Sequence, residues 1–269
     1  MNPSHLQFAL FGNPVAHSLS PVMHRAAYEA LGLNAEYSAY CVVNLEKALS
    51  GVRGMGIRGV SVTLPFKESV LPFLDEVDRT AIEIGAVNTV RNDNGRLSGF
   101  NTDVSGLMDD LETIFPPAGR CAVVLGAGGA ARSATFGLLR AGASVTVVNR
   151  TRSHGEALAR ALGCDFLPLS EINRIEGDLL VNATPVGMWP ETDASPVDGI
   201  VLQRYTMVVD TIYNPVRTRL LDNSRRVGCR TRNGVGMFVR QAAGQIRLWT
   251  GLEAPLDLME KTVLERLSL

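Results

Sequence analysis

The chain has 269 residues, of which 46% are hydrophobic and 20% are charged, and its formal net charge is −1. This length and composition provide enough apolar material for one large globular domain or two moderate ones. The near-neutral charge excludes a general attraction to nucleic acid, although local arginine groups can still bind a phosphate-bearing molecule.

Short apolar runs alternate with helix-like segments up to about residue 100, which is typical of an α/β domain with crossover helices. Strands are predicted at residues 7–11, 35–43, 59–63 and 86–91, and helices are predicted to begin near Pro21, Asn44, Lys67 and Asp78. A connecting helix is predicted at residues 104–114, because the prolines and glycine at residues 116–119 cannot continue it.

The second half of the chain shows a sharper pattern of strand, helix and strand at residues 121–125, 130–141 and 144–148. Further strands are predicted at residues 179–182 and 207–211, and helices at residues 237–249 and 256–267 close the chain. We therefore predict an α/β fold of two domains with a cleft between them. Residues 1–103, joined by 238–269, form the first domain, and residues 104–237 form a doubly wound second domain.

No stretch approaches the roughly 20 uninterrupted apolar residues of a membrane span, and the apolar run at residues 8–11 lacks the basic leader of a signal peptide. A cytoplasmic protein without membrane partners is therefore expected. The four cysteines are scattered, three of them in contexts where a small buried residue is common, and we interpret them as structural rather than redox-active. The four histidines form no close ligand pair, so no metal site is expected.

A glycine-rich motif, G-A-G-G-A-A at residues 126–131, follows a predicted strand and opens a predicted helix. Gly126 permits a tight turn, Gly128 allows a pyrophosphate to approach the backbone, and Ala131 allows close helix–strand packing. This context favours a Rossmann-like dinucleotide-binding domain over a glycine-rich turn that serves packing alone.

The end of the next strand distinguishes between two cofactors. An enzyme that uses NAD usually has an acidic residue there, whereas this chain has N-R-T-R at residues 149–152. Arg150 and Arg152 could pair with the 2′-phosphate of NADP, and Asn149 could bind the ribose. The pattern favours NADP, and the alternative is that both arginines are ordinary surface residues.

Polar clusters in the first half indicate a ligand rich in oxygen atoms. They are S-L-S-P at residues 18–21, V-T-L-P-F-K at 62–67, G-A-V-N-T at 85–89 and N-T-D at 101–103. The hydroxyls of Ser18 and Ser20 could both bind one carboxylate. Each cluster also has a structural interpretation, since Ser20 or Asp103 could cap a helix and Lys67 could lie on the surface.

In this order, the motifs resemble those of the shikimate dehydrogenase family, and the match continues through residues 182–188, 210–215 and 233–241. The resemblance implies that Ser18 and Ser20 hold a substrate carboxylate. It implies that the ring hydroxyls are bound by Thr63, Lys67, Asn88, Asp103 and Gln241, with Tyr213 lining the same pocket. It implies cofactor contacts from Gly126, Ala127, Gly128, Gly129, Ala130, Asn149, Arg150, Thr151, Arg152 and Gly234.

The activity implied by this resemblance is the NADP-dependent, reversible reduction of 3-dehydroshikimate to shikimate in aromatic amino acid (chorismate) biosynthesis. Lys67 and Asp103 are the implied catalytic residues. Lys67 would supply the proton, and Asp103 would orient the ammonium group of Lys67. One departure is His154, which stands where the family often has a second arginine for the 2′-phosphate.

Two alternatives remain open: a relative acting on quinate or an aminated analogue, and a non-catalytic ligand sensor on the same fold. The shikimate substrates are the expected partners, nucleic acid is not, and a homodimer is one assembly that the sequence leaves open.

Overall fold

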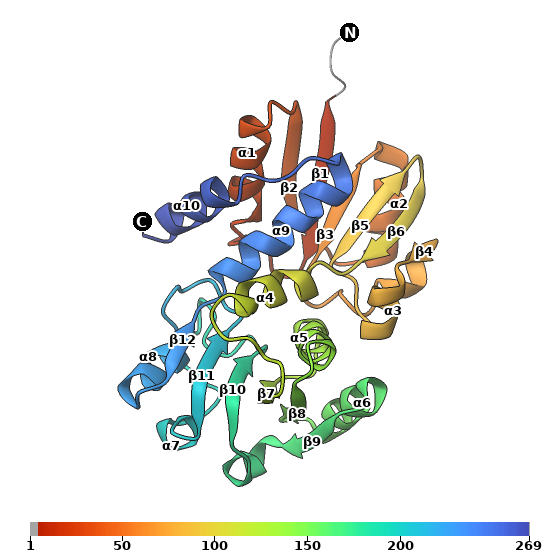
Figure 1. Cartoon of the computed structure of the whole chain (residues 1–269). Helices are drawn as coiled ribbons and strands as arrows, with labels where there is room; N and C mark the ends of the chain where they lie inside the picture. Colours follow the sequence, from red (N-terminus) through yellow and green to blue (C-terminus); the bar gives the residue numbers. More distant parts are fainter. Residues whose placement is uncertain (1–4, 269) are drawn as a thin grey trace. The chain divides into compact units, whose positions relative to one another are not determined.

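The structure is a computed structural model that describes residues 5–268. The chain divides into two compact units, one formed by Met1–Thr102 with Val239–Leu269 and the other by Asp103–Phe238. Residues 1–4 and 269, which the predicted first domain includes, lie outside the described residues. Each unit contains its own six-stranded sheet, labelled in Figure 1.

The sheet of the first unit has the strand order β2-β1-β3-β5-β6-β4. Its strands are β1 (Leu6–Gly12), β2 (Ala35–Cys41), β3 (Gly59–Val62), β4 (Glu76–Val77), β5 (Thr89–Asp93) and β6 (Arg96–Phe100). Strands β2, β1 and β3 are parallel, whereas β5 runs antiparallel to both β3 and β6. This sheet is therefore mixed, and the predicted strand at residues 86–91 begins three residues later than expected.

A tight hairpin produces the antiparallel pair. Asp93 lies opposite Arg96, and the two residues between them have positive φ angles, 53° at Asn94 and 93° at Gly95. Asn-Gly is the preferred pair for a two-residue turn in which both residues have positive φ, because neither pays the usual penalty for it.

The helices of the first unit cover both faces of its sheet. They are α1 (Ser20–Ala30), α2 (Leu45–Met55), α3 (Arg79–Ile84), α9 (Val235–Thr250), whose first four residues belong to the second unit, and α10 (Leu256–Leu267). In Figure 1, α9 lies across the strands of this sheet. Alternate strand residues point to opposite faces, so Ala9 packs in the core beneath α2 while Phe8 stacks on Trp249 of α9.

The helix predicted to begin near Lys67 is wrong. Residues 64–70 form turns, and only a short 3-10 helix, η1 (Leu71–Phe73), follows them. Pro72 explains the difference, because it has no backbone N–H and an α-helix begun at Lys67 could not have passed through it.

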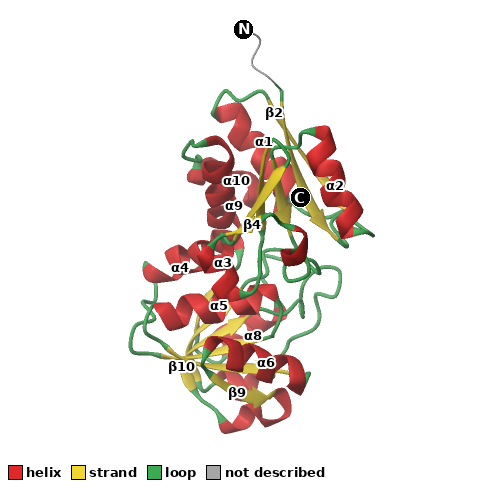
Figure 2. Ribbon diagram, turned by 90° about the vertical axis from the view of Figure 1, so that its right-hand side faces the viewer, coloured by secondary structure: helices red, strands yellow, loops and turns green. Residues whose placement is uncertain are grey.

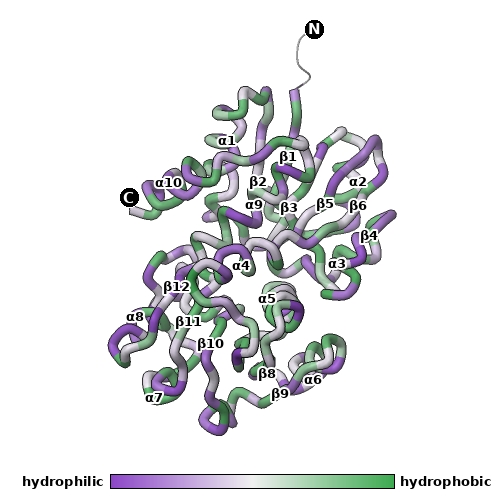
Figure 3. The backbone as a smooth tube through the Cα atoms, in the orientation of Figure 1, coloured by the Kyte–Doolittle hydropathy of each residue, from purple (hydrophilic) through white to green (hydrophobic). Residues whose placement is uncertain are grey.

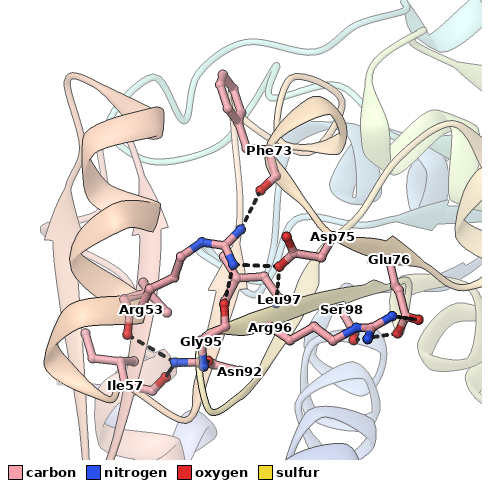
Figure 4. Close-up of polar contacts among 11 residues, drawn as sticks. Arg53, Ile57, Phe73, Asp75, Glu76, Asn92, Gly95, Arg96, Leu97 and Ser98 are labelled. Atoms are coloured by element: carbon pink, nitrogen blue, oxygen red, sulfur yellow. Dashed lines mark hydrogen bonds and ion pairs between the residues drawn. The ribbon is translucent and has the colours of Figure 1, made fainter.

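A polar network attaches α2 to the far edge of this sheet (Figure 4). Arg53 donates to Asp75 Oδ2 at 2.6 Å and to the carbonyls of Phe73 and Gly95. The hydrogen bond from Arg53, together with that from the Leu97 amide, lowers the pKa of Asp75 from its ordinary value. The buried side chain of Asn92 donates to the carbonyls of Val52 and Ile57.

The sheet of the second unit is entirely parallel, with the order β12-β11-β10-β7-β8-β9. Its strands are β7 (Cys121–Leu125), β8 (Ser144–Asn149), β9 (Asp165–Pro168), β10 (Gly177–Asn182), β11 (Tyr205–Asp210) and β12 (Arg230–Arg232). Counted from β7, this is the order 6-5-4-1-2-3 of a doubly wound dinucleotide-binding fold. The predicted Rossmann-like architecture is confirmed.

Helices lie on both sides of the second sheet (Figure 2). They are α4 (Asp103–Glu112), α5 (Gly129–Arg140), α6 (Arg152–Leu162), α7 (Gly199–Leu202) and α8 (Arg219–Arg226), together with the 3-10 helix η2 (Leu169–Arg174). Val124 of β7 belongs to a core with residues of α4 and α5, and its neighbour Val123 belongs to a second core with residues of α7 and α8. A central strand buried on both faces requires the continuous apolar run that the sequence shows at residues 121–125.

The surface helices are amphipathic. In Figure 3, α10 alternates between hydrophobic and hydrophilic stretches, and Met259 and Val263, four residues apart, are its buried residues. Among the described residues, no helix combines the length and the apolar character that crossing a membrane requires.

Candidate functional site

Backbone hydrogen bonds join two of the predicted substrate segments of the first unit to each other and to the loop after β1. The Asn13 amide, after β1, donates to the Leu64 carbonyl at 2.9 Å, and the Val87 amide donates to the Lys67 carbonyl at 2.7 Å. The segment that carries Lys67 is therefore held between the loop after β1 and the segment that carries Asn88. The sequence related these motifs only by their order in the chain. The sheet brings them together at the carboxyl ends of β1 and β3, and we call this end of the sheet the substrate edge.

Asn88 reaches this edge because β5 is antiparallel to its neighbours. Asn88 precedes β5, so it lies beside the carboxyl ends of β3 and β6. Its backbone N–H donates to the Phe100 carbonyl at 3.1 Å. Asn88 Nδ2 lies 2.9 Å from Thr102 Oγ1 and 3.4 Å from Oε1 of Gln241 on α9. Two predicted substrate residues that are 153 positions apart in the chain are thus neighbours.

Ser18 and Ser20 lie side by side at the start of α1. The Ser18 hydroxyl donates to Ser20 Oγ at 3.2 Å, and it also accepts from the Ser20 amide at the same distance. Leu19, not Ser20, is the N-cap residue of α1, and no side-chain capping bond is present. The capping alternative for Ser20 is therefore wrong, and the two hydroxyls are close enough to bind the oxygens of one carboxylate.

The remaining predicted substrate residues divide between the units. Lys67 and Thr63 are partly buried in the first unit. Asp103 is 3% exposed and is the first residue of α4 in the second unit. Tyr213 also belongs to the second unit, where its ring stacks on Phe238 with centroids 4.0 Å apart.

The glycine-rich motif lies at the switch point of the second sheet, where β7 and β10 meet. Gly126 has a φ of 115°, and a Cβ there would lie 3.1 Å from the Ala183 carbonyl oxygen after β10. Gly128 is the N-cap of α5, and a Cβ there would meet nothing within 4 Å. A helix N-terminus with open space above its glycine fits a pyrophosphate, because the first-turn amides have no intrahelical acceptors.

The end of β8 presents the predicted 2′-phosphate residues. Arg150, Thr151, Arg152 and His154 are exposed. Arg152 Nε donates to Glu156 Oε1 at 2.7 Å, so its charge is partly compensated, and it is the first residue of α6. Asn149 Nδ2 donates to the Thr151 carbonyl, which shapes this turn. Arg150 is the stronger candidate for a phosphate contact.

A buried carboxylate that sequence reasoning did not single out ties the end of β10 to the loop after β11. Asp210, at the end of β11, is fully buried and accepts from Asn182 Nδ2, the Ile212 amide and Thr218 Oγ1. Burial raises the pKa of Asp210 to about 6, against the opposing effect of these hydrogen bonds. The signal in the sequence was an acidic residue ending an apolar strand.

The loop after β11 also contacts Gly234, one of the predicted cofactor residues. The Gly234 amide donates to the Ile212 carbonyl at 3.0 Å, and a Cβ at Gly234 would lie 2.2 Å from the Thr211 carbonyl oxygen. Only glycine fits between these backbone segments.

His24 is a second buried polar residue that sequence reasoning did not single out. It follows the serine pair on α1, is 0% exposed, and stacks on Tyr37 with ring centroids 4.0 Å apart. Burial lowers its pKa to about 4, and its Nδ1 bonds to the Ser20 carbonyl. Its Nε2 has no hydrogen-bond partner among the described residues.

The cysteines depart in part from expectation. Cys229 is buried and Cys164 is partly buried, but Cys41 and Cys121 are exposed, so the expectation that three of the four occupy buried contexts is wrong. Burial raises the pKa of the Cys164 thiol to about 11, which disfavours its reactive thiolate. Within residues 5–268, no group of three or more histidine, cysteine or acidic side chains could hold a metal ion.

Together, the parallel sheet, its glycine-rich switch point and the edge of hydroxyl, amide and lysine groups define a two-unit α/β protein of the dinucleotide-dependent oxidoreductase type.

Three family models match the chain. They describe a shikimate dehydrogenase substrate binding domain at residues 10–90, a shikimate / quinate 5-dehydrogenase at residues 111–187 and a shikimate 5′-dehydrogenase C-terminal domain at residues 234–264. The chain belongs to the shikimate dehydrogenase family, as its motifs predicted.

Curated relatives and solved structures agree with this assignment. The shikimate dehydrogenase (NADP(+)) of Methanopyrus kandleri is 46% identical over 96% of this chain and 94% of its own, and that of Moorella thermoacetica is 43% identical over 96% and 92%. A shikimate 5-dehydrogenase of Thermus thermophilus, crystallised with NADP(H) and shikimate, is 42% identical, covers 97% of this chain and 99% of its own, and has a TM-score of 0.88.

Proposed function

We propose that this chain is an NADP-dependent shikimate dehydrogenase that catalyses the reversible reduction of 3-dehydroshikimate to shikimate, a step of chorismate biosynthesis. The observation that carries the proposal is the similarity to curated enzymes of this activity along nearly the whole chain, at 46% identity for one of them. Both units are covered, so neither the substrate half nor the cofactor half has been replaced. The alternatives of a quinate enzyme and of a ligand sensor are outcomes of the assay below.

The first unit is the proposed substrate-binding part. The paired hydroxyls of Ser18 and Ser20, 3.2 Å apart, suit a carboxylate. Asn88 and Gln241, whose amide groups meet, suit ring hydroxyls. We assign further contacts to Thr63, Lys67, Asp103 and Tyr213.

The proposed proton donor is Lys67. Ketone reduction leaves a negative charge on the substrate oxygen, and an ammonium group both stabilises that charge and supplies the proton. The reduced nicotinamide supplies the hydride when it is bound. The buried carboxylate of Asp103 is proposed to orient the ammonium group and to accept a hydrogen bond from a substrate hydroxyl.

The second unit is the proposed NADP-binding part, and its residues fit that cofactor. The positive φ of Gly126 and the open space at Gly128 suit the pyrophosphate, and no acidic residue ends β8 to repel a 2′-phosphate. The assigned contacts are Gly126, Ala127, Gly128, Gly129, Ala130, Asn149, Arg150, Thr151, Arg152 and Gly234. A cytoplasmic location and a homodimer are further proposals, the latter testable by light scattering.

The test is the appearance of reduced nicotinamide with shikimate and NADP, compared with quinate and with NAD. We expect turnover with shikimate and NADP, and a loss of kcat of at least about 100-fold in Lys67→Ala, since removal of a general acid costs this much. Turnover of quinate alone would assign the relative, and binding of shikimate without turnover would assign the sensor. A matched control is Lys47→Ala, on the exposed surface of α2, which should leave kcat unchanged.

A further inference from the structure

A buried chain of hydrogen bonds leads to Asn88 from the interior of the first unit. Tyr37 Oη donates to Ser61 Oγ at 2.6 Å, and Ser61 Oγ donates to Gln245 Oε1 at 2.7 Å. Gln245 Nε2 donates to Thr89 Oγ1 at 3.2 Å, and Thr89 Oγ1 donates to Asn88 Oδ1 at 2.8 Å. All five side chains are buried, and Gln245 is 2% exposed.

Two backbone groups fix the direction of this chain. The Thr102 amide can only donate, and it lies 2.8 Å from Asn88 Oδ1, so that atom must be the oxygen of the side-chain amide. The Asn88 carbonyl can only accept, and it lies 3.3 Å from Gln245 Nε2, so that atom must be the nitrogen. Neither amide can be reversed without placing two donors or two acceptors together.

The consequence is a fixed polarity at the substrate edge. Asn88 Oδ1 accepts from Thr89 Oγ1 and the Thr102 amide, and Thr102 Oγ1 is a third donor to it at 3.2 Å. Asn88 Nδ2 is therefore the donor end of the amide, 2.9 Å from Thr102 Oγ1 and 3.4 Å from Gln241 Oε1. Gln241 Oε1 accepts a hydrogen bond from Asn88 Nδ2. The oxygen of the Gln241 amide therefore faces Asn88, and its Nε2 lies on the other side of the amide group. The two amides are thus held in one orientation relative to each other.

We propose that Gln245 is a positioning residue that, through Thr89 and the Asn88 carbonyl, fixes the orientation of the Asn88 side chain, so that Asn88 Nδ2 donates to Gln241 Oε1 and holds the amide of Gln241 in one orientation at the proposed substrate site. The inference deepens the proposed function and rests on it for the identity of the ligand. Gln245 itself lies one helical turn beyond Gln241 on α9 and touches neither substrate nor cofactor in this role.

The first test replaces Gln245 with leucine, which keeps the size and removes the polar chain. We expect the KM for shikimate to rise about 10-fold, with kcat within about 3-fold and the KM for NADP unchanged, because a ground-state contact is misplaced. The control is Asn92→Leu, which removes another buried amide of the same unit from the network in Figure 4 and should leave the KM for shikimate unchanged. Equal KM values for Gln245→Leu and the unchanged protein would overturn the proposal.

The second variant is Gln245→Glu. A protonated glutamate can still accept from Ser61 and donate to the Asn88 carbonyl, so we expect its KM for shikimate at pH 6 to lie closer to that of the unchanged protein than Gln245→Leu does. A purely structural role predicts no such rescue. A KM as high as that of the leucine variant would also overturn the proposal.

A ligand-free readout separates this inference from the proposed function. The Thr102 amide is protected by Asn88 Oδ1, so its hydrogen exchange should accelerate at least about 10-fold in Gln245→Leu and remain unchanged in Asn92→Leu. Unchanged exchange would refute the positioning role. Inactivity of the unchanged protein with shikimate would refute the proposed function alone, because the exchange experiment still decides the role of Gln245.

Discussion

Arg150 and Arg152 show how neighbouring residues of one type differ once they are folded. Both are exposed after β8, but Arg152 is paired with Glu156 one turn along α6. No hydrogen bond or ion pair to the described part of the chain engages Arg150. The sequence predicted a phosphate-binding role for either, and the helical pairing favours Arg150.

Replacement of Arg150 by alanine should raise the KM for NADP about 10-fold, because a charge-assisted hydrogen bond to the 2′-phosphate is removed. The KM for NAD, which lacks that phosphate, should not change. Arg152→Ala is the matched control and should have a smaller effect, since its guanidinium is shared with Glu156. Steady-state kinetics with both cofactors measures these constants, and equal effects of the two variants would contradict the assignment.

The buried imidazole of His24 should make the first unit acid-sensitive. Its pKa is about 4 in the folded protein, against 6.5 in the unfolded chain. The unfolded state therefore binds more protons between these values, and the free energy of unfolding falls as the pH falls from 6.5 to 4. The loss amounts to about 3 kcal/mol.

His24→Phe retains a ring of similar size against Tyr37 and cannot be protonated. We expect the stability of this variant to decrease less than that of the unchanged protein over the same pH range. Urea denaturation at pH 6.5, 5.5 and 4.5 gives the two curves, and parallel curves would show that His24 is not the titrating group.

At the level of elements, Asp210 connects the end of β10 with the loop after β11 and with Thr218, the N-cap of α8. Its folded pKa of about 6 is above the ordinary value of 3.8. The folded state therefore binds more protons between these values, and the stability contributed by Asp210 is present at low pH and lost as the pH rises through 6.

Asp210→Asn removes this titration while keeping an oxygen that can accept from Asn182 and Ile212. We expect the variant to gain stability relative to the unchanged protein as the pH rises from 4 to 7, by up to about 3 kcal/mol. The sign is opposite to that of His24. Thermal unfolding of both proteins across this range measures the difference, which should be absent if Asp210 stays ionised throughout.

Helices and strands were predicted correctly from the sequence where the hydrophobic pattern clearly matched one type of secondary structure. The strand at residues 121–125 and the helix at residues 256–267 were predicted to the residue, because each is bounded by turn or proline signals. The β5–β6 hairpin was missed although Asn94-Gly95 is a strong hairpin signal. Without this hairpin, the antiparallel direction of β5 was not predicted. That direction explains why Asn88, which precedes β5, lies beside residues that follow β3 and β6.

For the whole molecule, the C-terminal segment completes the unit that begins the chain. Trp249 donates to the Val90 carbonyl and stacks on Phe8, and a Cβ at Gly59 would lie 2.3 Å from the Trp249 ring. The return of Val239–Leu269 to this unit is a long-range feature, since these contacts join positions 159 or more residues apart.

Truncation after Phe238 should therefore unfold the first unit and leave the second folded. The second unit keeps its parallel sheet and both of its cores, whereas the first loses Gln245, Trp249 and α10. Hydrogen exchange followed by mass spectrometry should show rapid exchange in residues 5–102 and protection in the sheet of residues 121–232. Protection of residues 5–102 in the truncated chain would contradict this dependence.

The sequence by itself determined the α/β class, the dinucleotide motif, the preference for NADP and the family, because these depend on local periodicity and on short motifs in order. Only the tertiary structure decided that Asn88 and Gln241 meet, that Asp210 joins the end of β10 to the loop after β11, and that Gln245 sets the direction of the amides. These features depend on hydrogen bonds between residues separated in the chain, which a sequence does not specify until the fold brings the groups together: parallel strands do so for Asp210, and antiparallel β5 with the returning α9 for Asn88, Gln241 and Gln245.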